Sequence, residues 1–398
     1  MCARKGGVTA PKGFVASSAE AGIKQAGGLD IGLLAADSVC SVAGTFTTNR
    51  IRASCVDWSS KRVSSGRGRA VICNSGNANA CTGERGRRDT ERMAREVAGR
   101  LGIKAAEVCV ASTGVIGEPL PMGKVADAVP GLVSRLSPRG GPGFARAIMT
   151  TDTVPKECAV KLDISGATCA IGGAAKGSGM IHPRMATMLA FVTTDVGVAP
   201  RPLQRILSRV VERTFNNLTI DGDTSTNDMV LLMANGASGV SLSTPGEHDT
   251  FEKSLYQVCN ELCAAIAGDG EGATKRIEIE VRGGKSSRDA KRVAQAVANS
   301  NLVKTAIFGN DPNWGRILCA IGYAGAPFSR SRLSVSLAGM PVCRGTEPIR
   351  FARGKMRRAL QRSRVPVSID LGLGRGSAVA HTCDLSYDYI RINAEYHT

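Results

Sequence analysis

Two amphipathic helices in the second half of the chain place the strongest constraint on its fold. Within residues 202–215 and 251–266, apolar residues recur three and four positions apart, which places them along one face of a helix. The two apolar stripes are formed by Leu203, Ile206, Leu207, Val210 and Val211, and by Phe251, Leu255, Val258, Cys259, Leu262 and Ile266. The sequence RIEIEV at residues 276–281 then alternates apolar and charged residues, which is typical of a strand with one buried face. Long helices combined with such strands predict an α/β or α+β fold in which helices and sheets pack as layers.

The first half of the chain repeats a short apolar strand followed by a loop that contains glycine. Residues 70–73 are predicted to form a strand that enters a loop rich in Asn and Gly, and residues 108–111 a strand that precedes a Ser-Thr-Gly segment. Between these strands, residues 89–101 have the periodicity of a helix. The remaining predictions are a loop over residues 137–143 and strands broken by glycines over residues 366–398.

The composition limits the partners that the protein can have. A formal net charge of +17 on 398 residues raises the possibility of a nucleic-acid partner. The basic residues are dispersed, however, and aromatic residues that could stack on bases make up only 4% of the chain. We therefore expect no nucleic-acid partner, and we interpret the charge as favouring solubility and the attraction of small anions. No stretch approaches the ~18 consecutive apolar residues of a membrane span, and the N-terminus lacks an apolar signal segment, so we expect a cytoplasmic protein without membrane contact.

The cysteines and histidines do not form a recognisable metal-binding pattern. Thirteen cysteines and four histidines show no CxxC pair and no zinc-type spacing. We therefore expect reduced and mostly buried thiols and no metal site. The glycine-rich segments GGKSS and GLGRG also lack the spacing of a phosphate-binding loop or of a dinucleotide-binding motif.

The segment KGSGMIHPRMATMLAFVTTD, residues 176–195, places a threonine where a glycine-containing loop gives way to an apolar strand. Thr187 directly precedes Met188–Val192, which are all apolar. A threonine becomes a strong nucleophile when it is the first residue of a chain, because its own α-amine, with a reference pKa of about 7.7–8.0, can act as the base. Such a role requires cleavage of the bond between Ala186 and Thr187. From the residues alone, a purely structural threonine at the edge of a buried strand stays an open alternative.

The same segment resembles the signature of the ornithine acetyltransferase (ArgJ) family. Members of that family cleave their own chain at an Ala–Thr bond and carry the acetyl group on the new N-terminal threonine. Further segments resemble blocks of the family and follow the family order from near residue 8 to the C-terminus. These segments are GVTAPKGF, AGTFTTNR, CNSGNANACTG, STGVIG, TTDTVPK, DGDTSTNDM, GDGEGATK, FGNDPNWGRI and TCDLSYDYIRINAEY. The resemblance therefore extends over nearly the whole chain.

The resemblance implies roles for individual residues. Thr187 would be the nucleophile and, after cleavage at Ala186–Thr187, its own general base. Thr113 and Gly114 match the pair that stabilises the charge on the acetyl oxygen. The positions that match substrate-binding residues are Thr153, Lys176, Thr187, Glu271, Asn393 and Thr398. Lys176 could pair with a substrate carboxylate and Glu271 with the side-chain ammonium of ornithine. Taken singly, these residues have ordinary alternatives as a surface lysine, a turn glutamate and, for Asn393, an amide at a strand edge.

The reaction implied by the resemblance moves the acetyl group of N2-acetylornithine to glutamate in arginine biosynthesis. It requires no metal and no tightly bound cofactor, and the use of acetyl-CoA as a second donor is left open. The implied fold has stacked α/β/β/α layers, with residues 1–186 as the α chain and residues 187–398 as the β chain of an α2β2 heterotetramer. Arg184 stands where the family usually has asparagine, and we expect it to slow cleavage or to reshape the pocket.

Two other functions are carried as alternatives. An aminopeptidase or amidase of the related self-cleaving fold would share the nucleophile but would hydrolyse its substrate, and it would release free acetate or cleaved peptide. A basic nucleic-acid-binding protein would retain DNA or RNA in a salt-sensitive manner and would keep an uncleaved chain.

Overall fold

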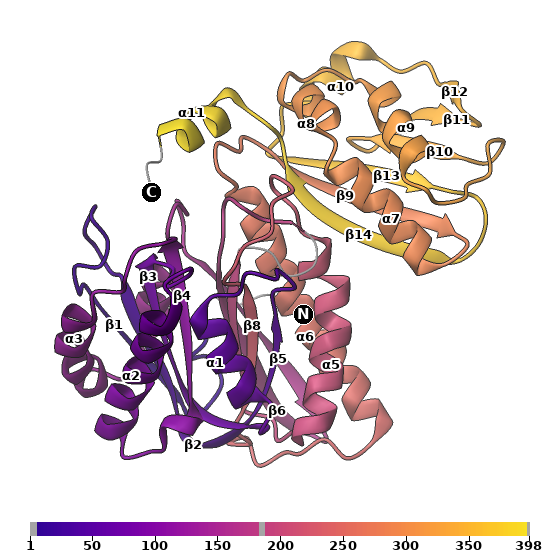
Figure 1. Ribbon diagram of the computed structural model, residues 1–398. Coiled ribbons are helices and arrows are strands. Elements are labelled where there is room, and N and C mark those ends of the chain that lie inside the picture. Colours follow the sequence, from indigo (N-terminus) through magenta and orange to yellow (C-terminus); the bar gives the residue numbers. More distant parts are fainter. Residues whose placement is uncertain (1–5, 183–187, 396–398) are drawn as a thin grey trace.

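The computed structural model describes residues 6–182 and 188–395, and in this part of the chain the strands form two sheets flanked by helices (Figure 1). The expected α/β class, with sheets and helices in layers, is confirmed. In the described ranges, no helix combines the length and the apolar character that crossing a membrane requires.

The first sheet has the strand order β4-β3-β2-β8-β7-β6-β5, and β1 pairs with β2. Its strands are β1 (Phe14–Ala19), β2 (Ile31–Phe46), β3 (Arg67–Asn77), β4 (Val108–Val115), β5 (Lys156–Ile164), β6 (Ala167–Lys176), β7 (Leu189–Thr194) and β8 (Met229–Ala234). The parallel strands β7 and β8 lie in the interior of the sheet, and all of their residues are buried. A strand that is covered on both faces needs apolar residues at nearly every position. This explains the unbroken apolar run that follows Thr187 in the sequence.

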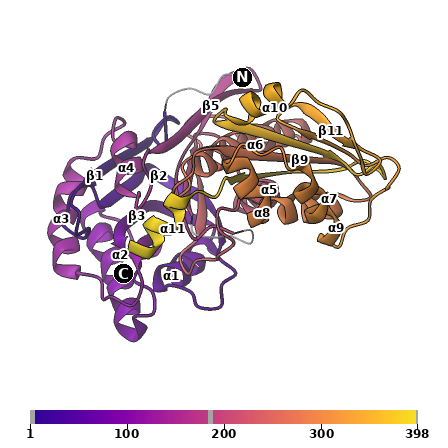
Figure 2. The same ribbon diagram turned by 90° about the horizontal axis from the view of Figure 1, so that it is seen from above.

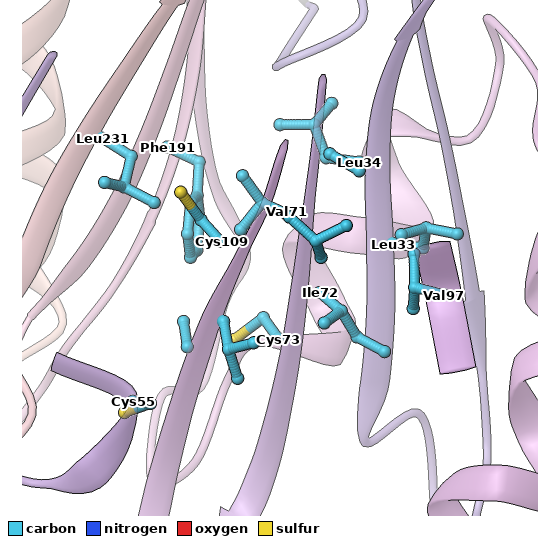
Figure 3. Close-up of a cluster of buried hydrophobic side chains, with 14 of the residues drawn as sticks. Leu33, Leu34, Cys55, Val71, Ile72, Cys73, Val97, Cys109, Phe191 and Leu231 are labelled. Carbon is cyan, nitrogen blue, oxygen red and sulfur yellow. The ribbon is translucent and has the colours of Figure 1, made fainter. Parts of the chain in front are cut away.

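Helices cover both faces of the first sheet. One face packs against α1 (Ser54–Val63), α2 (Gly83–Leu101), α3 (Met122–Ser134) and α4 (Gly141–Ala147), and the other against α5 (Pro200–Arg213) and α6 (Pro245–Gly268). Figure 3 shows part of the first core, in which Val97 of α2 lies beside Leu33 of β2. Along β7, Phe191 belongs to this core, whereas Ala190 and Val192 belong to the second. Two short 3-10 helices, η1 (Ala105–Glu107) and η2 (Phe215–Asn217), complete this part of the chain.

The second sheet has the strand order β12-β11-β10-β13-β9-β14 and its own core. Its strands are β9 (Arg276–Gly284), β10 (Ser334–Leu337), β11 (Met340–Arg344), β12 (Glu347–Pro348), β13 (Arg364–Asp370) and β14 (Gly376–Cys383). Its helices are α7 (Ser287–Ala298), α8 (Asn301–Phe308), α9 (Trp314–Tyr323) and α10 (Arg353–Leu360). Seen from above, this sheet and its helices form a lobe beside the first sheet (Figure 2). The last helix, α11 (Tyr387–Glu395), leaves that lobe and returns toward the first sheet (Figure 1).

Most of the elements predicted from the sequence are present, and they are generally longer than predicted. The two amphipathic helices are confirmed as α5 and α6, and the RIEIEV segment is β9, whose apolar residues are fully buried. The strands at residues 70–73 and 108–111 are confirmed as β3 and β4. The helix predicted from residue 89 is α2, which begins six residues earlier, at Gly83, and ends before Gly102 in the left-handed conformation.

Two sequence predictions were wrong in part. Residues 137–143 are not entirely a loop, because α4 begins at Gly141, where Pro142 suits a first helical turn and Phe144 is buried. The C-terminal stretch is not strand throughout, because residues 387–395 form α11. Tyrosine and isoleucine favour strands in general, but an Asp388–Arg391 ion pair three residues apart supports a helix here.

Candidate active site

Thr113 and Gly114 lie near the end of β4, where this strand runs parallel to β3. Gly114 pairs with Gly76 of β3 and has a φ of +134°. A Cβ atom at Gly114 would lie 2.3 Å from the carbonyl carbon of Gly76, so the close approach of the two strands requires glycine. The Thr113 side chain is buried beside this contact. A threonine hydroxyl and a backbone N–H are thus presented by consecutive residues at the end of one strand.

Lys176 ends β6 and is buried rather than exposed, which excludes the alternative of a surface lysine. Its Nζ donates hydrogen bonds to the hydroxyl oxygens of Thr150, at 2.7 Å, and of Thr113, at 3.4 Å. Burial lowers the pKa of Lys176, although the carboxylate of Asp152 opposes this effect. The structure therefore brings together Lys176 and Thr113, which are 63 residues apart in the chain.

Lys176 lies close to a buried network of ion pairs. Asp152 accepts hydrogen bonds from the Lys156 ammonium at 2.6 Å and from the Gly177 N–H at 2.7 Å. Lys156 also pairs with Asp269 at 2.5 Å. Burial by itself would raise the pKa of Asp152, but the positive charges of Lys176 and Lys156 outweigh it and hold that pKa at about 2. Two lysines and two aspartates therefore share this interior, and their charges balance.

Thr153 does not join Lys176 and Thr113. Its side chain is exposed, its hydroxyl donates to Asp269, and its N–H donates to the same carboxylate at 3.0 Å. Thr150 contacts Lys176 instead, and the hydroxyl of Thr151 donates to Glu271 at 2.8 Å. The sequence Thr-Thr-Asp-Thr contains three threonines, and nothing in the pattern itself indicates which of them face the interior.

Glu271 and Asn393 lie in direct contact although 122 residues separate them. The side-chain amide of Asn393 donates to Glu271 Oε2 at 2.9 Å, and Thr151 donates to Glu271 Oε1. The backbone N–H of Glu271 donates to the Ser178 carbonyl at 2.8 Å. Asn393 is on α11, so the alternative of an amide at a strand edge is wrong. Glu271 thus connects the C-terminal helix to the loop that follows Lys176.

The proposed nucleophile Thr187, its partner Ala186, Arg184 and the C-terminal Thr398 lie outside the described residues. The strand that follows Thr187 is described, and its residue Leu189 pairs with Lys176. Chain connectivity therefore places the start of β7 beside the buried lysine and the hydroxyl of Thr113.

Asp228 is a buried residue beside the start of β7 that the sequence reasoning assigned no role. Its Oδ1 accepts a hydrogen bond from the Met188 N–H at 2.9 Å. Burial raises the pKa of this carboxyl well above its usual value, although the Met188 N–H and Lys176 act in the opposite direction. Asp228 lies in the DGDTSTNDM segment, which resembles a block of the family and could have indicated a role for it. The parallel pairing of β7 with β8 brings Asp228 to Met188.

The cysteines of the described ranges are free, and ten of the twelve are buried, in agreement with the interpretation as core residues. In the same ranges, no three His, Cys, Asp or Glu side chains are grouped so that they could hold a metal ion.

Comparison with known proteins places the chain in a family. The ArgJ family matches residues 15–398. The arginine biosynthesis bifunctional protein ArgJ of Symbiobacterium thermophilum is 50% identical over 397 residues, which cover 99% of each chain. A crystal structure of the protein of the same name from Bacillus halodurans has 44% sequence identity and a TM-score of 0.50, and the match covers 52% of this chain and 98% of that chain. A structure of ornithine acetyltransferase from Mycobacterium tuberculosis complexed with ornithine has 41% identity and a TM-score of 0.41, with 44% of this chain and 94% of that chain covered.

The family match and the 50% identity both extend over nearly the whole chain. The protein therefore belongs to the ArgJ family.

Proposed function

We propose that the protein transfers the acetyl group of N2-acetylornithine to glutamate in arginine biosynthesis, after it has cleaved itself between Ala186 and Thr187. Membership of the ArgJ family supports acetyl transfer as the reaction. The observation that carries the site assignment is the contact of buried Lys176 with Thr113, beside the start of β7.

In the first half of the reaction, the Thr187 hydroxyl attacks the acetyl carbonyl of the donor, and the α-amine of the same residue takes the hydroxyl proton. The negative charge on the carbonyl oxygen is stabilised by the Thr113 hydroxyl and the Gly114 N–H. Because the Thr113 oxygen accepts a hydrogen bond from Lys176, its own proton is free to be donated. When the intermediate collapses, the bond from carbon to N2 breaks, and the proton held by the α-amine passes to that nitrogen. Ornithine is released, and the acetyl group remains as an ester on Thr187.

In the second half, the neutral amine of glutamate attacks the acetyl ester, and the same two donors stabilise the charge. The bond to the Thr187 oxygen breaks, the proton lost by the attacking amine passes through the Thr187 α-amine to that oxygen, and N-acetylglutamate leaves. Glu271 is placed to receive the side-chain ammonium of ornithine, because Thr151 and Asn393 hold both of its oxygens in position. Thr153 and Thr398 stay in the proposal as substrate-binding positions. The reaction uses no metal or tightly bound cofactor, and acetyl-CoA is proposed as an additional donor.

The position of the cleavage site explains how the two products would stay together. Residues 1–186 would form the α chain and residues 187–398 the β chain. β7 and β8 of the β chain lie between β2 and β6 of the α chain in one hydrogen-bonded sheet. The solved Bacillus halodurans chain covers only about half of this protein, which supports a division near the middle. We propose that two such pairs form an α2β2 heterotetramer in the cytoplasm, without nucleic-acid or membrane partners.

The mass of the purified protein tests self-cleavage. We expect two fragments that meet between Ala186 and Thr187, because the hydroxyl attacks its own preceding carbonyl and the resulting ester is hydrolysed. Intact-mass spectrometry of freshly purified protein measures this directly. A full-length chain that persists in protein able to transfer acetyl groups would exclude the mechanism, and release of acetate without transfer to glutamate would favour an amidase.

Thr113→Val tests the oxyanion assignment. Valine fills the same space but cannot donate a hydrogen bond, so kcat should fall by about 10²–10³-fold, as is typical for the loss of one such donor. Steady-state transfer assays measure the loss, and thermal unfolding checks that the fold is retained. The matched control is Thr168→Val, an exposed threonine on β6, which should leave transfer unchanged. Equal activity of the two variants would remove Thr113 from the mechanism.

A further inference from the structure

A cavity of about 450 Å³ lies at the ends of β3 and β4, the second of which carries Thr113 and Gly114. Its wall includes Lys24, Gly76, Val115, Thr150 and Thr151. Thr150 contacts Lys176, and Thr151 contacts Glu271, so the cavity adjoins the side chains already placed in the site. Lys24 has no role in the reaction described above.

The segment that carries Lys24 is fixed by a fully buried carboxylate. Asp30 accepts hydrogen bonds from the N–H groups of Ala21 at 2.6 Å, of Ile23 at 2.5 Å and of Lys24 at 3.2 Å. One carboxylate that holds three N–H groups gives the connection between β1 and β2 a defined shape. Asp30 therefore positions Lys24 at the cavity.

Lys24 packs directly on the strand next to the oxyanion residues. A Cβ atom at Gly76 would lie 2.9 Å from Lys24 Cγ and 3.1 Å from Lys24 Cα, so glycine at this position makes room for the lysine. Gly76 in turn pairs with Gly114. Lys24 therefore packs against the residue of β3 that pairs with Gly114 of the proposed oxyanion position.

The ammonium group of Lys24 has no carboxylate partner within 4.0 Å in the part of the chain that the structure describes. It donates to the Leu29 carbonyl at 2.8 Å, while the nearby Asp30 carboxylate is occupied by backbone N–H groups. Burial lowers the pKa of Lys24, and the positive charge of Lys176 adds to this effect, whereas the carboxylates of Asp30 and Asp152 oppose it. Glu118 also lines the cavity, but it is exposed to solvent. A half-buried cation beside a cavity of this size is suited to bind an anionic group of a ligand.

The two amino acids exchanged in the proposed reaction differ in the charge of their side chains. Ornithine ends in an ammonium group, which Glu271 can accept, whereas glutamate ends in a carboxylate, which Glu271 would repel. A site that accepts both in turn needs a separate cation for glutamate. We propose, on the basis of the function proposed above, that Lys24 binds the side-chain carboxylate of the glutamate acceptor and so determines acceptor specificity.

The test compares Lys24→Met with Lys24→Arg and with Lys161→Met, which removes an exposed lysine from β5. Initial rates are measured with acetylornithine and glutamate varied in turn, and with glutamine as an acceptor whose side chain is uncharged. Lys24→Met should raise KM for glutamate by about tenfold or more, the usual cost of a lost charge-assisted hydrogen bond. KM for acetylornithine should change by less than about twofold, because its side chain does not meet Lys24. The preference for glutamate over glutamine should collapse, and Lys24→Arg should restore part of it.

The controls separate this inference from the function on which it rests. Lys161→Met should behave as the wild type. Wild-type protein that transfers acetyl groups to glutamate, together with an unchanged glutamate preference in Lys24→Met, would overturn the role of Lys24 alone. An equal rise in KM for both substrates would also overturn it, because it would assign Lys24 to the carboxylate that both amino acids share. Wild-type protein that transfers no acetyl group to glutamate would overturn the proposed function and this inference together.

Discussion

Thr187→Ala is expected to abolish both self-cleavage and acetyl transfer. Alanine has no hydroxyl to attack the preceding carbonyl, so the chain should stay whole, and no α-amine should be released at position 187. The same hydroxyl would carry the acetyl group, so the transfer rate should fall by at least about 10⁴-fold, as is found when a covalent nucleophile is removed. Intact mass and a transfer assay on the same preparation measure the two losses.

Thr187→Ser is the matched control for this variant. Serine keeps the hydroxyl and, once cleaved, the α-amine, so some cleavage and some transfer should survive. If Thr187→Ala still moved acetyl groups at a rate comparable to the wild type, the nucleophile would have to be another residue. If Thr187→Ala cleaved normally but failed to transfer, the hydroxyl of Thr187 would be needed for the acetyl intermediate and not for processing.

Local sequence patterns predicted helices and strands well where apolar residues recur with a single, clear period. The apolar stripes of α5 and α6 and the alternation in β9 follow from the periods of 3.6 and 2 residues. α11 was missed because its tyrosines and isoleucine suit a strand, while its contact with the Glu271 loop depends on residues 122 positions away. The pairing of the strands into two sheets also depends on residues far apart in the chain, so the periodicity of apolar residues does not predict it.

The candidate site was predicted through the family resemblance to a greater extent than through the residues themselves. Lys176 and Thr113 were both named from the sequence, and the structure places them in contact. The structure does not bring Thr153 to Lys176 and Thr113, because its N–H and hydroxyl donate to Asp269, which is 116 residues away in the chain. No local pattern in the Thr-Thr-Asp-Thr segment indicates this distant contact. Asp228 lies in the DGDTSTNDM segment, but neither its place beside β7 nor that of Lys24 beside β3 can be read from the local sequence. The pairing of β7 with β8 and the packing of Lys24 on Gly76 bring them to the site.

The largest expected effect on stability comes from removing the buried carboxylate of Asp152, which lies close to Lys176. Asp152→Ala would remove the carboxylate that pairs with Lys156 and lies close to Lys176, and it would leave the Gly177 and Thr150 N–H groups without this acceptor. Removal of one partner from a buried ion pair costs about 3–5 kcal/mol, because the remaining charge stays buried without compensation. Urea unfolding of the cleaved protein should therefore show a loss of this size.

An exposed pair provides the control for that measurement. Glu91→Ala breaks the pair of Glu91 with Arg95 on α2, whose side chains are 42% and 70% exposed, and should cost less than about 1 kcal/mol. Equal losses in the two variants would mean that burial does not strengthen the Asp152 pair. Asp152→Asn keeps an acceptor oxygen for Gly177, so it separates the contribution of the charge from that of the hydrogen bond.

The dependence of this loss on pH follows from the pKa of Asp152. The folded protein holds this pKa at about 2, because Lys176 and Lys156 outweigh the effect of burial, whereas an unfolded aspartate has a pKa of about 3.9. A folded pKa below the unfolded one means that the carboxylate stabilises the protein fully above about pH 3.9 and that this contribution is lost as the pH falls toward about 2. The difference in free energy of unfolding between the wild type and Asp152→Asn should therefore be constant near neutral pH and should narrow in that acidic window. A difference that stayed constant down to pH 2 would show that Asp152 stabilises the site through its hydrogen bonds and not through its charge, and Lys176 would then need another counter-charge to stay protonated in the interior.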